Sequence, residues 1–360
     1  MVQANTEIRS SRNPLGTSCC FSFTNSGTRY LQRMERDVLT WDEAINEYML
    51  YMQGNGRKLS TMRRYRYDLV QLAIWIENSE DALNLPFYRD ITTKQFNDYC
   101  KVAKHMQSRS AASLKRIMSV IINFLDYHSV FLDSVDRGRE ILLELDNFAP
   151  DNEIEKLLFT MINFEGLTNY QVSGRKFIMN RNLFLVRLMI YYGFSIHDLA
   201  TLTMQDINFG QGTLMPVSAG GIKRAIPLNN TDRHLLVATY KDIPESVRPR
   251  QNTNDPFFVT FHHATSTFQW DYSTESPKKL TKIAIQRMFQ KEIKRADVHH
   301  LSPTTLRNRH ILDSLRANVS AAEIKVLLGM KSIEAMHRYI IFFRSSPLPK
   351  NFSKIWRGNQ

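Results

Sequence analysis

Apolar residues recur at helical spacing along most of this 360-residue chain, and this periodicity constrains its fold more than any other feature. Thr40 and Glu43 form a capping pattern ahead of an apolar face that includes Tyr48 and Met52. Three short extended pieces between 206 and 228 predict a small antiparallel sheet. Apolar faces like the one that follows Thr40 predict further helices at 60–76, 91–102, 110–127, 181–192, 284–296, 303–318, 321–328 and 333–343. Another helix is predicted to begin at 195. The fold is therefore expected to be mainly α-helical with one small antiparallel sheet.

Changes in composition divide the chain into segments. Residues 1–36 are rich in Ser, Asn, Gly, Thr and Arg without a regular period, which predicts a flexible tail. A compact helical domain is expected at 37–132, followed by an acidic linker at 133–150 that ends in a proline. A second domain is expected at 151–345, and residues 346–360 form a C-terminal tail.

The composition limits the classes of protein to which the chain can belong. Hydrophobic residues make up 43% and charged residues 23%, as in a soluble globular protein. The 47 Lys and Arg residues exceed the 35 Asp and Glu residues and give a net charge of +12, which favours an anionic partner such as a nucleic acid. No run of 18 apolar residues and no signal pattern is present, so we expect no membrane span and a location in the cytoplasm.

The cysteines and histidines do not predict a metal site. Cys19 and Cys20 are adjacent and Cys100 stands alone, which is unsuited to a disulfide framework or to zinc. His262-His263 and His299-His300 are adjacent pairs whose side chains diverge. We therefore expect neither a metal nor another cofactor.

Several motifs fall in an order that resembles the tyrosine recombinases, or phage integrases. The first domain contains Arg57-Lys58-Leu59-Ser60-Thr61-Met62-Arg63-Arg64-Tyr65-Arg66-Tyr67-Asp68-Leu69, which is similar to a DNA-contacting helix of that family. The resemblance implies a helical core-binding (SAM-like) domain followed by a domain of the recombinase catalytic type. In the second domain the matching landmarks are Tyr192 to Leu199, Ile226-Pro227-Leu228, Thr304 to Arg307, Leu327-Leu328-Gly329 and Tyr339.

The same resemblance implies a chemistry. Tyr339 occupies the position of the nucleophile, which joins to a DNA 3′-phosphate, and Arg307 occupies that of a phosphate-binding arginine. The chain departs from the family at four positions that would carry an arginine, a lysine, a histidine and a second histidine or tryptophan; they hold Ser195, Ala219, Thr304 and Met330. Lys223 and Arg224 are the candidate substitutes, with His197 and His310 as further ones.

Basic residues on predicted helices are candidates for contacts with DNA phosphates. In the first domain these are Lys58, Arg63, Arg64 and Arg66, and in the second Lys282, Arg287, Lys291 and Arg309. The tail after Tyr339 is apolar around Phe352 to Trp356, so we expect a homo-oligomer on double-stranded DNA.

Three functions are compatible with these observations. The first is a sequence-specific DNA-binding protein with lost or impaired strand exchange and a repressor-like or accessory role in a bacterial phage or mobile element, where an active recombinase is a candidate partner. The second is an active recombinase that uses substitute residues. The third is a basic helical scaffold for protein partners.

Overall fold

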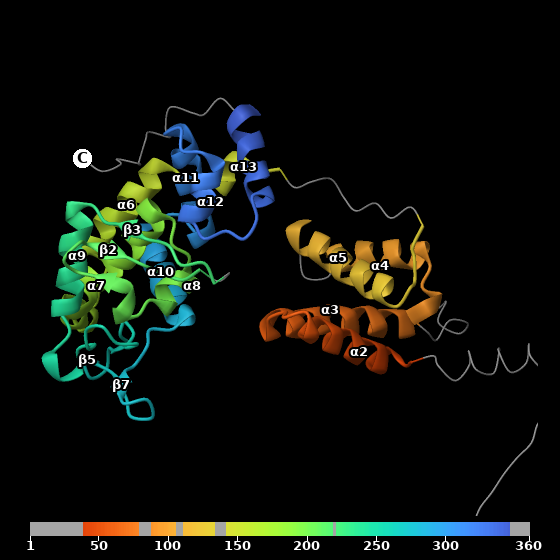
Figure 1. Ribbon diagram of the computed structural model, residues 1–360, viewed down its shortest axis with the longest axis horizontal. Coiled ribbons are helices and arrows are strands. Elements are labelled where there is room, and N and C mark those ends of the chain that lie inside the picture. Colours follow the sequence, from red (N-terminus) through yellow and green to blue (C-terminus); the bar gives the residue numbers. More distant parts are fainter. Residues whose placement is uncertain (1–38, 79–87, 106–110, 134–141, 219–220, 346–360) are drawn as a thin grey trace, which may run out of the picture. The chain divides into compact units, whose positions relative to one another are not determined.

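The chain folds into two units, Met1–Ile141 and Leu142–Gln360, which are described here separately (Figure 1). The computed structural model describes residues 39–78, 88–105, 111–133, 142–218 and 221–345. The predictions for the tails at 1–36 and 346–360 therefore lie outside the described residues, as does the part of the predicted linker at 134–141.

All the regular elements in the described part of the first unit are helices. Its elements are α2 (Trp41–Gly54), α3 (Leu59–Glu77), η2 (Tyr88–Asp90), α4 (Thr93–His105) and α5 (Ala111–Tyr127). The Thr40 side chain accepts a hydrogen bond from the Glu43 N–H, which fixes the start of α2. The core is rich in aromatic rings: Phe124 is fully buried and lies 6.1 Å from Trp41 between ring centroids, and 5.8 Å from Tyr88.

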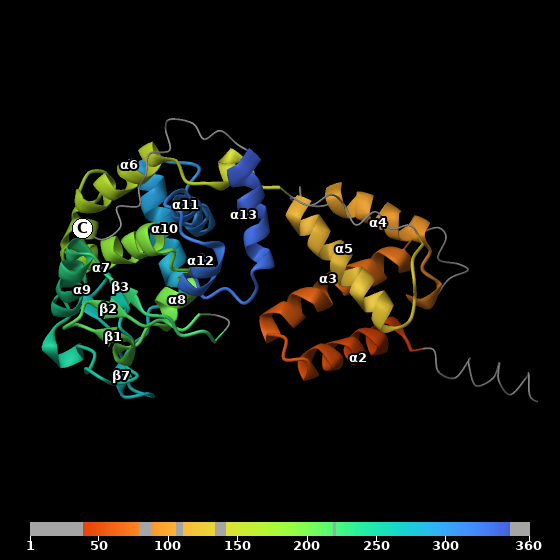
Figure 2. The same ribbon diagram turned by 45° about the horizontal axis from the view of Figure 1, so that its top comes forward.

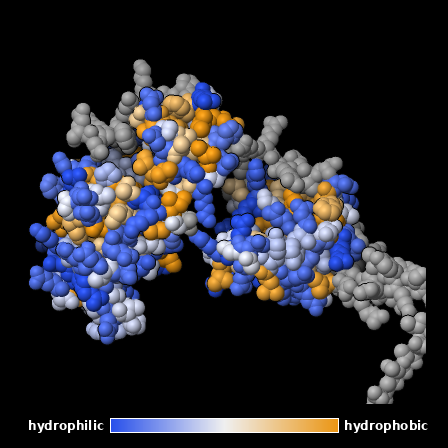
Figure 3. All heavy atoms as spheres, viewed as in Figure 1, coloured by the Kyte–Doolittle hydropathy of each residue, from blue (hydrophilic) through white to orange (hydrophobic). Residues whose placement is uncertain are grey.

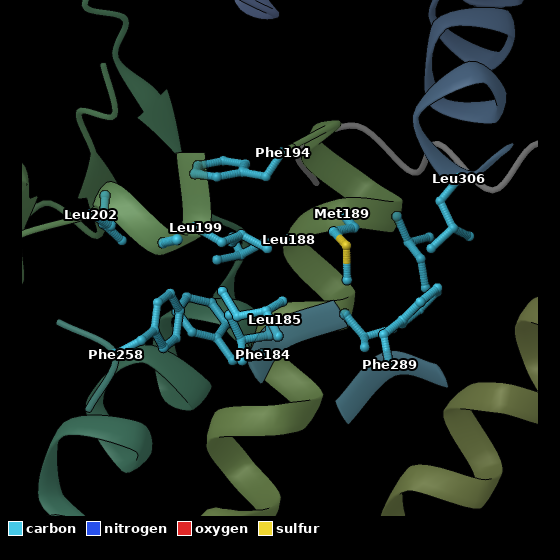
Figure 4. Packing of buried hydrophobic residues seen from close by; sticks show 14 of the residues in the cluster. Phe184, Leu185, Leu188, Met189, Phe194, Leu199, Leu202, Phe258, Phe289 and Leu306 are labelled. Carbon is cyan, nitrogen blue, oxygen red and sulfur yellow. The ribbon is translucent and has the colours of Figure 1, made fainter. Parts of the chain in front are cut away.

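The second unit surrounds its longest helix, α7. The helices are α6 (Asp151–Ile162), α7 (Asn169–Tyr192), α8 (Ile196–Thr201), α9 (Asn230–Lys241), α10 (Lys282–Ala296), α11 (Pro303–Arg316), α12 (Ala321–Leu327) and α13 (Glu334–Ser345), with 3-10 turns η3 (Leu145–Asn147), η4 (Met204–Asp206) and η5 (Glu245–Val247). In Figure 4, Phe184 and Met189 project from α7 in different directions, toward Phe258 and toward Phe289 with Leu306. Because α7 is buried along its C-terminal half, its sequence there is almost continuously apolar.

The small sheet has the predicted antiparallel form. Strands β1 (Ile207–Asn208), β2 (Thr213–Leu214) and β3 (Ile226–Pro227) lie in that order, with Leu214 paired to both Ile207 and Ile226. This register puts three apolar side chains on the buried face. Two further hairpins, β4 (Phe261–His262) with β5 (Thr267–Phe268) and β6 (Trp270–Asp271) with β7 (Ser276–Pro277), were not predicted and lie at the lower edge of this unit in Figure 1.

A smaller apolar cluster joins the two ends of the second unit. Phe148, which precedes α6, stacks on Phe342 of α13 with ring centroids 4.5 Å apart. The same cluster includes Leu312, Leu328 and Met336, so it holds α13 against α11 and the end of α12. The last described helix is thus fastened to the residues with which the unit begins.

The fold class expected from the sequence is confirmed, with corrections to its elements. Helix α7 begins at Asn169, twelve residues before the predicted start, and α6 and α9 were not predicted. Helix α3 begins at Leu59, so Ser60 lies inside it and does not cap it. No helix in the described parts of the chain is sufficiently long and apolar to cross a membrane.

Candidate active site around Arg307 and Tyr339

Arg307 lies at the junction of three helices. Ser302 caps α11 through the Thr305 N–H and Pro303 occupies its first turn, so Arg307 projects from the second turn of a well-defined helix. Its Nη1 donates to the Gly193 carbonyl at 2.8 Å and its Nη2 to the Leu328 carbonyl at 2.9 Å. Helix α11 packs against α7, α12 and α13 (Figure 2). Arg307 ties the ends of α7 and α12 to α11 while 23% of its side chain remains exposed.

Two guanidinium groups share one buried carboxylate at this junction. Arg224 Nη2 lies 2.9 Å from Asp198 Oδ2, and Arg307 Nη1 lies 3.8 Å from the same oxygen. Burial lowers the pKa of Arg307, Asp198 raises it and Arg224 lowers it. Two guanidinium groups beside one carboxylate give this cluster one excess positive charge.

Arg224, one of the two candidate substitutes for the missing catalytic residues, is deeply buried. Its side chain is 1% exposed, and its Cζ lies 5.5 Å from the centroid of the Phe194 ring. Its Nε and Nη1 find no hydrogen-bond acceptor among the described residues. Leaving such buried donors unpaired costs about 1 to 3 kcal/mol each.

Tyr339 is held from two sides by polar groups. The ring is only 3% exposed, and its hydroxyl donates to Asn308 Oδ1 at 2.7 Å. Arg338 Nη2 donates to the same hydroxyl at 2.8 Å. The Asn308 amide in turn donates to the Asn147 carbonyl at 2.8 Å, so the position of the hydroxyl depends on the residues that precede α6. The hydroxyl of Tyr339 donates to the residue that directly follows Arg307, and Tyr339 raises the pKa of Arg307, so the two predicted residues lie near one another.

The described positions that depart from the family pattern have structural roles or face solvent. The Ser195 hydroxyl accepts from the Asp198 N–H at 3.2 Å and caps α8. Thr304 is exposed on the first turn of α11, and Met330 packs against the apolar cluster of α13. Ala219 lies outside the described residues. Of the described departures, only Ser195 has a hydroxyl at the junction; the cap uses this hydroxyl as an acceptor, which leaves one neutral O–H donor.

The remaining candidate substitutes differ in their exposure. Lys223 is exposed and its backbone is bridged to Val217. His197 is half-buried on α8, whereas His310 is buried on α11. Burial and the neighbouring Arg307 lower the pKa of His310 to about 4, so its imidazole is neutral near pH 7.

Most of the predicted phosphate-contacting residues face solvent. Those that do are Lys58, Arg63, Arg64 and Arg66 on or beside α3, and Lys282, Arg287 and Lys291 on α10. Arg309 is an exception, because it is 2% exposed and forms ion pairs with Asp151 at 2.6 Å and Asp313 at 3.0 Å. The helical period turns Arg309 inward, so it stabilises the fold and is removed from the set.

Sequence reasoning did not single out Asn308 or Arg338. Asn308 directly follows Arg307, and this adjacency was the only feature of the sequence that could have pointed to it as a site residue. Arg338 reaches the hydroxyl of the next residue, and neighbouring side chains on a helix usually diverge. No three His, Cys, Asp or Glu side chains in the described ranges are arranged to hold a metal ion.

The chain resembles known proteins in its sequence and in its fold. The tyrosine recombinase XerD of Oceanobacillus iheyensis is 20% identical over 297 residues, which cover 82% of this chain and 92% of that protein. Among solved structures, the XerH site-specific recombinase bound to difH superposes with a TM-score of 0.59 at 14% identity, covering 91% of this chain and 89% of that one. A lambda integrase tetramer bound to a Holliday junction gives a TM-score of 0.56 at 16% identity, covering 89% and 83%. The model of the phage integrase family matches residues 152–342, which is more than half of the chain, and the chain therefore belongs to that family.

Proposed function

We propose that this protein binds duplex DNA at a specific sequence and has lost strand exchange, or retains it only slowly. Its role is regulatory, as a repressor, or accessory to an active recombinase in a phage or mobile element. The observation that carries the proposal is the contrast between an intact framework around Arg307 and Tyr339 and the residues at the neighbouring family positions.

The effect on catalysis is expected to be large. Cleavage of a phosphodiester needs cationic donors around the phosphate and an acid for the leaving oxygen. Ser195, which caps α8 as an acceptor, can offer only a neutral O–H donor, and the thioether of Met330 lies against apolar side chains. Loss of one preorganised donor slows such reactions about 10²- to 10³-fold, although losses of this kind are not additive.

DNA binding is supported by features that do not depend on those positions. The structures of XerH and lambda integrase that resemble this chain contain DNA. The exposed basic side chains on α3 and α10 are suited to phosphate contacts, which add up over many residues. On the face of Figure 3, apolar residues gather over the part of the second unit that holds α11, α12 and α13. Three large apolar residues on or beside α12 and α13 are exposed: Val326, Ile333 and Phe343. This surface supports self-association of the protein on DNA.

The experiment uses a nicked suicide duplex whose sequence the purified protein has selected from random DNA. Wild type is expected to bind this duplex and to form no more covalent complex than Tyr339→Phe on a denaturing gel. A robust covalent complex that disappears in Tyr339→Phe would favour the alternative, an active recombinase. Absence of salt-sensitive binding would favour a scaffold for protein partners.

A further inference from the structure

Arg338 adopts an unusual contact for its place on α13. Side chains at adjacent helical positions normally point about 100° apart. Arg338 instead folds over the next residue, with its Cζ 4.8 Å from the centroid of the Tyr339 ring and its Nη2 2.8 Å from the hydroxyl oxygen. An exposed arginine side chain can also extend into water, but in this conformation the guanidinium of Arg338 lies beside the Tyr339 hydroxyl.

The charge of Arg338 has no carboxylate partner among the described residues. Glu334 stands one turn earlier on the same helix, at the spacing that commonly gives an ion pair. Glu334 accepts a hydrogen bond from Ser332 instead. Arg338 donates a single hydrogen bond, to the Tyr339 hydroxyl, so most of its five N–H groups have no protein acceptor in the described structure.

The site as a whole has an excess of cations. Arg224 and Arg307 share the single carboxylate of Asp198, and Arg338 adds a third guanidinium next to Tyr339. His310 contributes no charge near neutral pH, because burial lowers its pKa to about 4. Three guanidiniums beside one carboxylate favour an anion, and a guanidinium binds phosphate oxygens in pairs.

We propose that Arg338 leaves the Tyr339 hydroxyl when DNA binds and contacts a backbone phosphate. It thereby supplies, from the tyrosine's own helix, an exposed guanidinium beside Arg307 that Ser195 does not provide. This inference rests on the proposed DNA binding. A neutral hydroxyl is a weaker partner for a guanidinium than a phosphate, so the exchange of partners is favourable. The contact adds to DNA affinity whether or not the strand is cleaved.

The test measures how affinity for the selected duplex depends on salt, by fluorescence anisotropy with wild type, Arg338→Gln, Arg338→Lys and Arg344→Gln. Each lost phosphate contact reduces the slope of log K against log salt by about 0.9. Arg338→Gln is expected to show that reduction, whereas Arg338→Lys keeps the charge and most of the slope. Arg344 is exposed on the same helix and serves as the matched control, with an unchanged slope expected.

The outcomes separate this inference from the proposed function. If wild type binds with a steep slope that Arg338→Gln leaves unchanged, or that Arg344→Gln reduces equally, the role of Arg338 is refuted while DNA binding stands. If wild type shows no salt-dependent binding, the DNA-binding function fails and this inference fails with it. Tyr339→Phe removes the hydroxyl that competes for Arg338 and is expected to retain the full slope. A loss of about one contact in Tyr339→Phe would show that Arg338 needs the hydroxyl, contrary to the proposal.

Discussion

At the scale of single residues, the site is built from side chains that already have partners within the protein. Arg307 donates to two main-chain carbonyls, and Ser195 caps α8. A substitution such as Ser195→Arg would therefore add a charge and remove a cap together. Restoring the family residue at that position is not equivalent to restoring the family site, because Asp198 and the start of α8 are arranged around the serine.

His310 is expected to make the stability of the second unit depend on pH. Its pKa is lowered to about 4 in the folded protein, whereas an unfolded histidine titrates near 6.5. Below about pH 6.5 the unfolded chain binds the proton before the folded protein does, so the free energy of unfolding decreases as the pH is lowered from about 6.5 to about 4. Above this window the contribution of the neutral His310 to stability is fully present. Between about pH 7.5 and pH 5 the expected loss from His310 is about 2 kcal/mol, measurable by urea denaturation.

The variant His310→Leu provides the comparison for this measurement. Leucine cannot titrate, so the variant is expected to lose about 2 kcal/mol less than wild type between the two pH values, whatever its stability at neutral pH. The Glu153 hydrogen bond raises the pKa of His300, so that residue acts in the opposite direction and does not mimic the effect. Identical pH dependence in wild type and His310→Leu would contradict the assignment.

At the scale of elements, the sequence predicted what local patterns determine. The Ser302 cap and the apolar face of α11 are local signals, and both appear in the structure. The first half of α7 is polar and contains Gly174 and a buried Arg175, which pairs with Glu292 at 2.7 Å. Its buried face therefore shows no apolar periodicity, and this half of the helix was not predicted. A charge that is buried because of a distant partner cannot be recognised from its own neighbours in sequence.

The site shows the same division between local and long-range information. The spacing of Arg307 and Tyr339 was readable because each belongs to a motif. The inward orientation of Arg309 depends on Asp151 before it, and the contact of Arg338 depends on a rotamer. These features are set by tertiary packing, which no local pattern encodes.

Gly193 is expected to be the least replaceable residue at the junction of elements. It ends α7 with φ of 64°, in the left-handed region, and a Cβ there would lie 2.5 Å from Leu328 Cδ2 and 2.7 Å from His310 Cδ2. Gly193→Ala should therefore cost about 2 to 4 kcal/mol from strain and overpacking combined. Gly54→Ala, where a Cβ would meet nothing within 4 Å, is the control and should be near neutral by chemical denaturation. A small effect at Gly193 would mean that α11 and α12 move apart easily.

At the scale of the whole molecule, the distribution of basic residues is expected to govern affinity for DNA. The net charge of +12 is a property of the full chain, but only exposed groups can displace counterions from DNA. Burial removes Arg309 and Arg224 from that set, whereas the basic residues of α10 remain available. Net charge therefore overstates the number of possible phosphate contacts.

The basic face of α10 offers a direct measurement of this effect. The triple variant Lys282→Gln, Arg287→Gln and Lys291→Gln is expected to reduce the slope of log K against log salt by up to about 2.7, if each residue meets a phosphate. Its loss of affinity should be similar for specific and random duplexes, because phosphate contacts carry no sequence information. Arg309→Gln is not a suitable comparison, since its buried ion pairs stabilise the fold. An unchanged slope would show that the basic residues of α10 do not contact DNA phosphates.

The stacking of Phe148 on Phe342 has a consequence for genetic experiments on this protein. A stop codon before Glu334 removes the tyrosine together with the side chains that cover Phe148 and the start of the second unit. Such a null allele would report misfolding and degradation of the product, and its phenotype would not reveal whether Tyr339 is ever used. The Tyr339→Phe allele leaves the packing of α13 in place, so only the comparison of these two alleles separates the presence of the protein from its chemistry.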